Sequence, residues 1–138
     1  MTFKEKYTKI YRPLLIAYYY EALRLLYPRS GVDAQSDVII SMTTHPGRVV
    51  TTHLAVESLL RQRVKPNKII LYVSRTDFPK GNMDLTRRLL SQKKRGLEIV
   101  FLDVDHGPYD KLIHSYRKYR ENRIVTVDDD LMLSLIHI

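Results

Sequence analysis

The sequence contains no cysteine, so neither disulfide bonds nor thiolate metal ligands exist in this chain. It has no run of about 20 apolar residues, the length that a membrane-spanning helix requires. The N-terminal region also has no signal-peptide pattern, because its most apolar part, residues 14–20, is rich in tyrosine and lacks a small-residue cleavage site. Internal repeats and low-complexity tracts are missing as well. These absences argue against a disulfide scaffold, a secreted precursor and a repeat protein.

Basic residues outnumber acidic residues in a chain with enough apolar content to fold. The 138 residues are 44% hydrophobic, which fits one domain or part of one, with a sizeable core. Lys and Arg number 23 against 15 Asp and Glu, for a formal net charge of +8. That surplus favours an anionic partner, but does not choose among nucleic acid, a membrane surface and a phosphorylated small molecule. The expected location is the cytoplasm, with peripheral contact at the inner face of the membrane.

Residues 1–36 are predicted to form a helical lead-in followed by a linker. Pro13 suits the first turn of a helix. Apolar side chains then recur near helical spacing: Leu14, Leu15, Tyr18, Ala22, Leu25 and Leu26. Segment 28–36, "PRSGVDAQS", is turn-like and ends the lead-in.

From Asp37 onward, short apolar runs alternate with helical patterns. Strands are predicted at 37–42, 69–74, 97–104 and 123–127, and helices at 49–63, 83–96 and 109–122, with Gly96 as a C-terminal cap. Such alternation is typical of an α/β fold with a mostly parallel, Rossmann-like sheet and helices on both faces. The strands are continuously apolar, which fits burial on both faces. Residues 37–132 are therefore expected to form the main domain.

Ligands of such sheets bind beyond the carboxyl ends of the strands. The loops at 42–48, 74–82, 103–111 and 128–132 are therefore expected to carry the functional residues. Three adjacent carboxylates, Asp128, Asp129 and Asp130, directly follow the fourth strand. In extended geometry Asp128 and Asp130 point the same way, and two oxygen donors on one side suit Mn²⁺ or Mg²⁺. The alternative to a metal site is that the three aspartates form an acidic loop or cap a helix.

Four stretches in order resemble glycosyltransferases of the GT-A fold, broadly like family 2. "DVIISMTTHPGR" (37–48) resembles their first strand and loop, and "AVESLLRQRVKPNKIILYVS" (55–74) their first helix and second strand. "GLEIVFLDVDHGPYDKLIHSYRKY" (96–119) resembles the third strand and the segment after it, and "IVTVDDD" (124–130) the strand that carries a D-x-D motif. The resemblance implies sugar transfer from a nucleoside-diphosphate sugar to a glycan or lipid-linked acceptor.

Carried over position by position, the resemblance implies a donor site and a metal site. Thr43, Thr44, Asp105, Lys111 and Asp128 would bind the donor. Asp128 and Asp130 would bind Mn²⁺ or Mg²⁺, which bridges carboxylates to a diphosphate.

The sequence departs from this family in one large way, because it ends at Ile138, shortly after Asp130. The general base of an inverting enzyme is expected beyond the C-terminus, so no catalytic residue is assigned. The main domain is therefore expected to be a truncated donor-binding half. Residues 133–138, "LSLIHI", are interpreted as a fragment boundary or a non-native extension.

A phosphatase of the haloacid-dehalogenase type is an alternative. "VFLDVDHG" (100–107) places Asp103 and Asp105 after a strand, as in that family, where the first aspartate is the nucleophile and Mg²⁺ lies between the two. Here His106 replaces the usual glycine, and the motif follows the third strand instead of the first.

A basic binding module is the other alternative. Segments 87–96 and 116–123 are rich in Lys and Arg, and the second also contains Tyr116 and Tyr119. Solvated helix faces explain such runs more simply, so nucleic acid is not an expected partner. Basic faces and the tyrosine-rich lead-in could instead contact anionic lipid.

The histidines at 45, 53, 106 and 114 show no metal spacing on a shared face and are interpreted as surface or loop residues.

Overall fold

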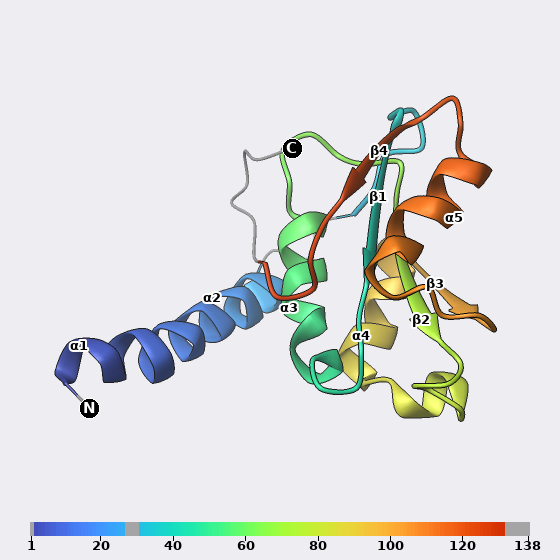
Figure 1. The fold of residues 1–138 in the computed structure, drawn as a ribbon. Helices are drawn as coiled ribbons and strands as arrows, with labels where there is room; N and C mark the ends of the chain where they lie inside the picture. Colours follow the sequence, from blue (N-terminus) through green and yellow to red (C-terminus); the bar gives the residue numbers. More distant parts are fainter. Residues whose placement is uncertain (1, 27–30, 132–138) are drawn as a thin grey trace. The chain divides into compact units, whose positions relative to one another are not determined.

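A computed structural model describes residues 2–26 and 31–131, and the chain divides into two compact units, Met1–Ser30 and Gly31–Ile138 (Figure 1). The first unit is helical: α1 spans Phe3–Lys6, a π-helical turn spans Tyr7–Tyr11, and α2 spans Arg12–Leu26. Pro13 lies in the first turn of α2, as predicted, although the chain is already helical before it. Within the described ranges, no helix is long and apolar enough to cross a bilayer.

The second unit contains a four-stranded, entirely parallel sheet, which confirms the predicted α/β fold class. Its strands are β1 (Val38–Thr43), β2 (Lys68–Ser74), β3 (Leu97–Leu102) and β4 (Arg123–Thr126), in the spatial order β3-β2-β1-β4. Every neighbouring pair is parallel. All four strands lie where the apolar runs predicted them, within one residue at each end except at the end of β3, which comes two residues earlier.

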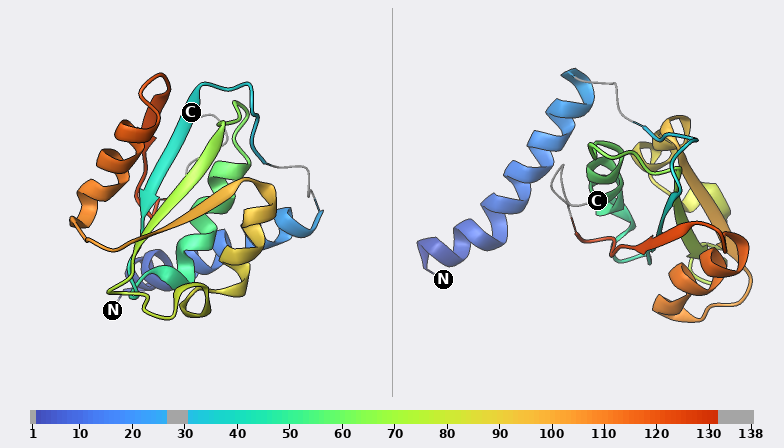
Figure 2. Two further views of the ribbon diagram at one scale, coloured as in Figure 1. Left: turned by 90° about the vertical axis from the view of Figure 1, so that its right-hand side faces the viewer. Right: turned by 90° about the horizontal axis from the view of Figure 1, so that it is seen from above.

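Helices cover both faces of this sheet (Figures 1 and 2). Helices α3 (Val49–Leu60) and α4 (Arg87–Ser91) pack over the larger core, to which the sheet contributes residues such as Ile40, Met42 and Leu71. Helix α5 (Asp110–Lys118) contacts β1, β2 and β4. The smaller core on the opposite face of the strands is built from Ile39, Ile70 and Tyr72. The central strands β1 and β2 are buried on both faces, as their continuous hydrophobicity predicts, whereas β3 and β4 are only partly buried.

The helix predicted at 83–96 is divided into three pieces. A 3₁₀ turn at Gly81–Asp84 precedes α4, and a second 3₁₀ turn at Gln92–Arg95 follows it. The division arises at Thr86, whose extended backbone and side chain cap the start of α4: its Oγ1 accepts a hydrogen bond from the Leu89 backbone at 3.2 Å. Gly96 ends the segment at φ +115°, which confirms the predicted C-terminal cap. The helix predicted at 109–122 ends earlier, at Lys118, and β3 ends at Leu102 instead of residue 104.

Part of the predicted linker is tied to the α/β unit by hydrogen bonds. The Gly31 backbone donates to Leu60 at 3.1 Å, and the Asp33 backbone donates to Pro66 at 2.8 Å. The Asn67 side chain donates to the backbone oxygens of Ala34 and Ser36. Residues 31–36 are therefore an ordered edge of this unit.

A buried carboxylate joins α3 to the segment after α4. Glu57 is 2% exposed, and Arg95 contacts both of its oxygens, at 2.7 and 3.0 Å. Arg61 donates from Nε at 2.7 Å, and Gln92 donates at 3.1 Å. Burial by itself raises the pKa of Glu57, but the hydrogen bond and charge of Arg95, with the hydrogen bonds of Gln92 and Arg61, outweigh it and leave the pKa below its ordinary value.

The strand order creates one topological switch point. The chain runs from β1 through α3 to β2, and through α4 to β3 at one edge of the sheet. It then returns through α5 and places β4 on the other side of β1. Crossovers on either side of β1 therefore diverge at its carboxyl end, which is where open parallel sheets bind ligands.

Candidate functional site

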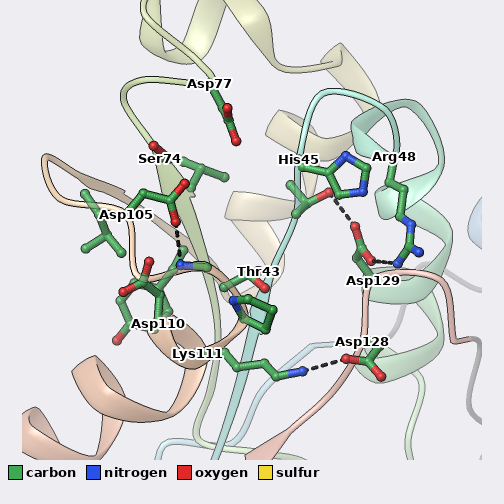
Figure 3. A pocket seen from close by; sticks show the side chains of 16 residues that line it. Thr43, His45, Arg48, Ser74, Asp77, Asp105, Asp110, Lys111, Asp128 and Asp129 are labelled. Carbon is green, nitrogen blue, oxygen red and sulfur yellow. Dashed lines mark hydrogen bonds and ion pairs between the residues drawn. The ribbon is translucent and has the colours of Figure 1, made fainter.

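A pocket of about 230 Å³ opens at this carboxyl edge of the sheet (Figure 3). Loops after all four strands contribute to it, as predicted for the loops at 42–48, 74–82, 103–111 and 128–132. Its lining is formed by Thr43, Thr44, His45, Arg48, Tyr72, Val73, Ser74, Asp77, Leu102, Asp105, Gly107, Pro108, Asp110, Lys111, Asp128 and Asp129. All five residues predicted to bind a donor are in this set, so the fold brings them to one cavity.

Asp129 anchors the loop after β4 to the loop after β1. It is 5% exposed, and its Oδ2 accepts a hydrogen bond from Thr44 Oγ1 at 2.7 Å. Thr44 is itself buried and also contacts Thr52 Oγ1 at 2.8 Å, at the start of α3. Asp129 Oδ1 pairs with Arg48 Nη1 at 3.0 Å. The middle aspartate of the triplet is thus a structural member of the site.

Asp128 and Asp130 are about half exposed, in contrast to Asp129 between them. The alternation in exposure matches the prediction from extended geometry, but the backbone at Asp129 and Asp130 forms a turn, in which the Leu131 backbone donates to the Asp128 backbone oxygen at 3.3 Å. Asp128 lines the pocket and forms an ion pair with Lys111 Nζ (Figure 3). Asp130 pairs with Arg48 Nη1 at 3.3 Å. Asp130 is not among the lining residues. The assignment of a metal ion to Asp128 and Asp130 stays a prediction, because both carboxylates have cationic partners here.

Arg48 was not singled out by the sequence, yet it joins two of the three aspartates. The hydrogen bond to Asp129 and the charges of Asp129 and Asp130 raise its pKa above the ordinary value. It precedes α3 and is 45% exposed, so its guanidinium can reach solvent or an anion. An arginine in a loop without periodicity gives no sequence signal of its own, apart from its place in a loop after a strand.

The loop after β3 contributes Asp105 and leads into α5. Asp105 Oδ1 accepts a hydrogen bond from the Gly107 backbone at 2.6 Å, where the chain turns at φ +66° (Figure 3). Lys111 follows in the first turn of α5 and aims its Nζ at Asp128. Asp103 behaves differently: it is 86% exposed, pairs with Arg75 Nε at 3.0 Å and does not line the pocket.

A buried polar cluster fixes α5 against the sheet beneath the pocket. Ser41 Oγ donates to the backbone oxygen of Lys111, and Ser115 Oγ donates to Ser41 Oγ at 3.0 Å. The Tyr72 hydroxyl contacts Ser115 Oγ at 3.1 Å, and burial raises the pKa of Tyr72. These contacts set the position of Lys111. The only sign of these contacts in the sequence is a serine, Ser41, inside the apolar run "VIISMT".

His45 and His106 are exposed loop residues, as predicted, but His53 is not, and the prediction that no histidines share a metal-ligating arrangement is wrong for His106 and His114. His53 is buried in α3. His106 and His114 do converge on a shared group: His106 Nδ1 lies 2.9 Å and His114 Nε2 lies 3.0 Å from Asp110 Oδ1. Together the three residues form a cluster with metal-ligating atoms within 4.8 Å of one another. His106 precedes the helix predicted at 109–122, so helical spacing alone did not link it to Asp110 and His114.

The pocket lining carries more negative than positive charge. Asp77, Asp105, Asp110, Asp128 and Asp129 line it, against Arg48 and Lys111. The two cations suit phosphate oxygens, whereas the carboxylates suit hydroxyl groups or a hard dication. No protein-family model matches the chain, and no curated protein or solved structure shows significant similarity to it.

Proposed function

We propose that residues 31–131 form the donor-binding half of a glycosyltransferase. It would transfer a sugar from a nucleoside-diphosphate sugar to a glycan or lipid-linked acceptor, with Mn²⁺ or Mg²⁺ as the metal. The proposal rests on the four-part sequence resemblance and on the parallel sheet, whose switch-point pocket gathers Thr43, Thr44, Asp105, Lys111 and Asp128.

The charge of the pocket is the observation that carries the metal assignment. Five lining carboxylates against two lining cations leave a surplus of negative charge. A diphosphate would be repelled from such a cavity unless a dication accompanied it. Asp128 and Asp130 are suitable ligands because both are exposed oxygen donors, although only Asp128 lines the pocket. A bound dication would stabilise the negative charge that develops on the departing diphosphate.

The residues predicted to bind the donor, together with Arg48, then have separate roles. With an ion at the carboxylates of Asp128 and Asp130, Lys111 would be free to contact phosphate oxygens, and Arg48, which keeps its pair with Asp129, would offer the rest of its guanidinium to them. Thr43 and Asp105 offer hydrogen-bonding groups to the nucleoside. Thr44 has a positioning role, because its hydroxyl is engaged by Asp129 and Thr52. We assign no catalytic base to the described residues.

The phosphatase alternative is less well supported. It needs Asp103 and Asp105 to face one Mg²⁺, but only Asp105 lines the pocket, and Asp103 is paired with Arg75 at the surface.

Calorimetric titration with UDP-sugars and GDP-sugars in the presence of Mn²⁺ tests the donor class. At least one such donor is expected to bind more tightly than the matching nucleoside monophosphate. Lys111→Ala should weaken binding about tenfold or more, because a charge-assisted hydrogen bond contributes roughly 1.5–3 kcal/mol. Asp103→Asn is the matched control and should bind like the wild type.

The proposal fails if no nucleoside-diphosphate sugar binds better than the monophosphate. Release of phosphate from a generic phosphoester, abolished by Asp103→Asn, would favour the phosphatase instead.

A further inference from the structure

The cluster of His106, Asp110 and His114 lies at the junction between the loop after β3 and helix α5. Asp110 is the first residue of α5, and His114 follows one turn later on the same side of the helix. His106 reaches back from the loop before the helix. The two rings meet one carboxylate oxygen, Asp110 Oδ1, from opposite ends of the segment.

The burial of Asp110 is unusual for a carboxylate with these neighbours. Its side chain is 4% exposed, and its only ion-pair partners among the described residues are the two histidines. Neither Lys nor Arg supplies the permanent positive charge that a buried carboxylate ordinarily needs. Burial raises the pKa of Asp110, yet hydrogen bonds from the His106 backbone and from both rings outweigh it and lower the pKa, so an anion is favoured here.

The three groups form a ligand set for a transition-metal ion. Two tetrahedral Zn²⁺ ligands with bonds of about 2.0 Å lie about 3.3 Å apart. The observed separations of 2.9 and 3.0 Å between each ring nitrogen and Asp110 Oδ1 differ from that value by less than half an ångström. Two imidazoles and one carboxylate favour Zn²⁺ over Mg²⁺ or Ca²⁺, which prefer oxygen ligands alone.

Surrounding contacts hold the ligands in place, as outer contacts do in metal centres. Asp110 Oδ2 accepts a hydrogen bond from the His106 backbone at 3.0 Å, which leaves Oδ1 directed at the rings. The His114 ring packs against Tyr72, with the ring centroids 5.4 Å apart. Tyr72 in turn contacts Ser115 of α5. The carboxylate and one ring are therefore oriented before any ion binds.

We propose that His106, Asp110 and His114 bind a Zn²⁺ ion through Nδ1, Oδ1 and Nε2 respectively, with the remaining coordination open to water. This site is separate from the oxygen-ligand site proposed at Asp128 and Asp130, and it does not depend on glycosyl transfer. Asp110 also lines the pocket, so the ion fixes the loop that carries Asp105 to the start of α5, where Lys111 begins its reach toward Asp128.

Zn²⁺ alone, without nucleotide, is the probe. Metal-stripped protein is titrated with Zn²⁺ against a chromophoric chelator, and with Co²⁺ while visible d–d absorption is recorded. The wild type is expected to bind one Zn²⁺ per chain and to give the intense Co²⁺ bands of a four-coordinate, tetrahedral site. Each of His106→Ala, Asp110→Asn and His114→Ala should weaken Zn²⁺ binding by about 100-fold or more, since loss of an outer contact alone typically costs 10- to 100-fold.

His45→Ala is the matched control, because His45 lines the same pocket outside the cluster. It should bind Zn²⁺ like the wild type. Circular dichroism checks that each variant is folded, and a rise in the urea midpoint on addition of Zn²⁺ should occur in wild type and His45→Ala only. The proposal is overturned if wild type and His114→Ala bind Zn²⁺ equally, or if His45→Ala weakens binding as much as the cluster variants. The three residues would then serve as a hydrogen-bonded start of α5 and nothing more.

Discussion

Replacement of Asp129 by alanine should destabilise the α/β unit, whereas the same change at Asp130 should not. Asp129 is 5% exposed and accepts a hydrogen bond from the buried Thr44 hydroxyl at 2.7 Å. Hydrogen bonds to an ionised group contribute about 1.5–3 kcal/mol. Thr44 keeps Thr52 as a partner after the change, which places the expected loss near the lower end, at about 2 kcal/mol. Arg48 adds little to this loss, because it is 45% exposed.

Asp130→Ala is the matched control for this prediction. Asp130 is 53% exposed, and its ion-pair partner Arg48 retains Asp129. Surface changes of this kind stay within about 0.5 kcal/mol. Urea unfolding followed by circular dichroism gives both free energies, and thermal unfolding should show a midpoint lower by roughly 10 °C for Asp129→Ala alone. Equal unfolding free energies for the two variants would refute the structural role of Asp129.

Two further predictions concern the framework that holds the pocket. Glu57→Gln should lower the unfolding free energy by about 3 kcal/mol at pH 7, because it leaves Arg95 without its buried carboxylate. The pKa of Glu57 lies below its ordinary value of 4.5, so the stability that its carboxylate contributes is complete above pH 4.5 and is lost as the pH falls through the folded-state pKa. Wild type and variant should therefore converge in unfolding free energy in acid. A difference between them that does not change with pH would contradict this. Gly96→Ala should cost well over 1 kcal/mol, because its Cβ would lie 2.4 Å from a Val32 methyl at φ +115°. Gly107→Ala shares a positive φ but has nothing within 4 Å, so equal losses at the two glycines would exclude the clash as the cause.

The fold class could be predicted from the sequence because the strand patterns are unambiguous. Runs such as "DVIISM" and "IILYVS" are too short and too rich in β-branched residues for a helix, and the intervening helical patterns require parallel crossovers. Parallel strands place all their carboxyl ends at one edge. Residues as distant in sequence as Thr43, Asp105 and Asp128 could therefore be assigned to one site before any contact was known.

The rest of the site depended on information that residue patterns do not carry. Extended geometry predicted that the Asp129 side chain would point away from those of Asp128 and Asp130. It did not predict that Asp129 would contact Thr44 and Arg48. Likewise, the separation of Asp110 from His106 and from His114 is four residues each. That spacing is meaningful only once the turn at Gly107 is known to lead directly into α5.

The dependence of nucleotide affinity on the dication at Asp130 tests the proposed function most directly. UDP is titrated calorimetrically into wild type, Asp130→Ala and His114→Ala, each with Mn²⁺ and with EDTA. His114→Ala serves to separate the carboxylate site from the histidine cluster. Mn²⁺ is expected to strengthen UDP binding at least tenfold in wild type and in His114→Ala, whereas Asp130→Ala should lose most of this gain. UDP affinity that is the same with Mn²⁺ and with EDTA, or a gain that survives in Asp130→Ala, would contradict it.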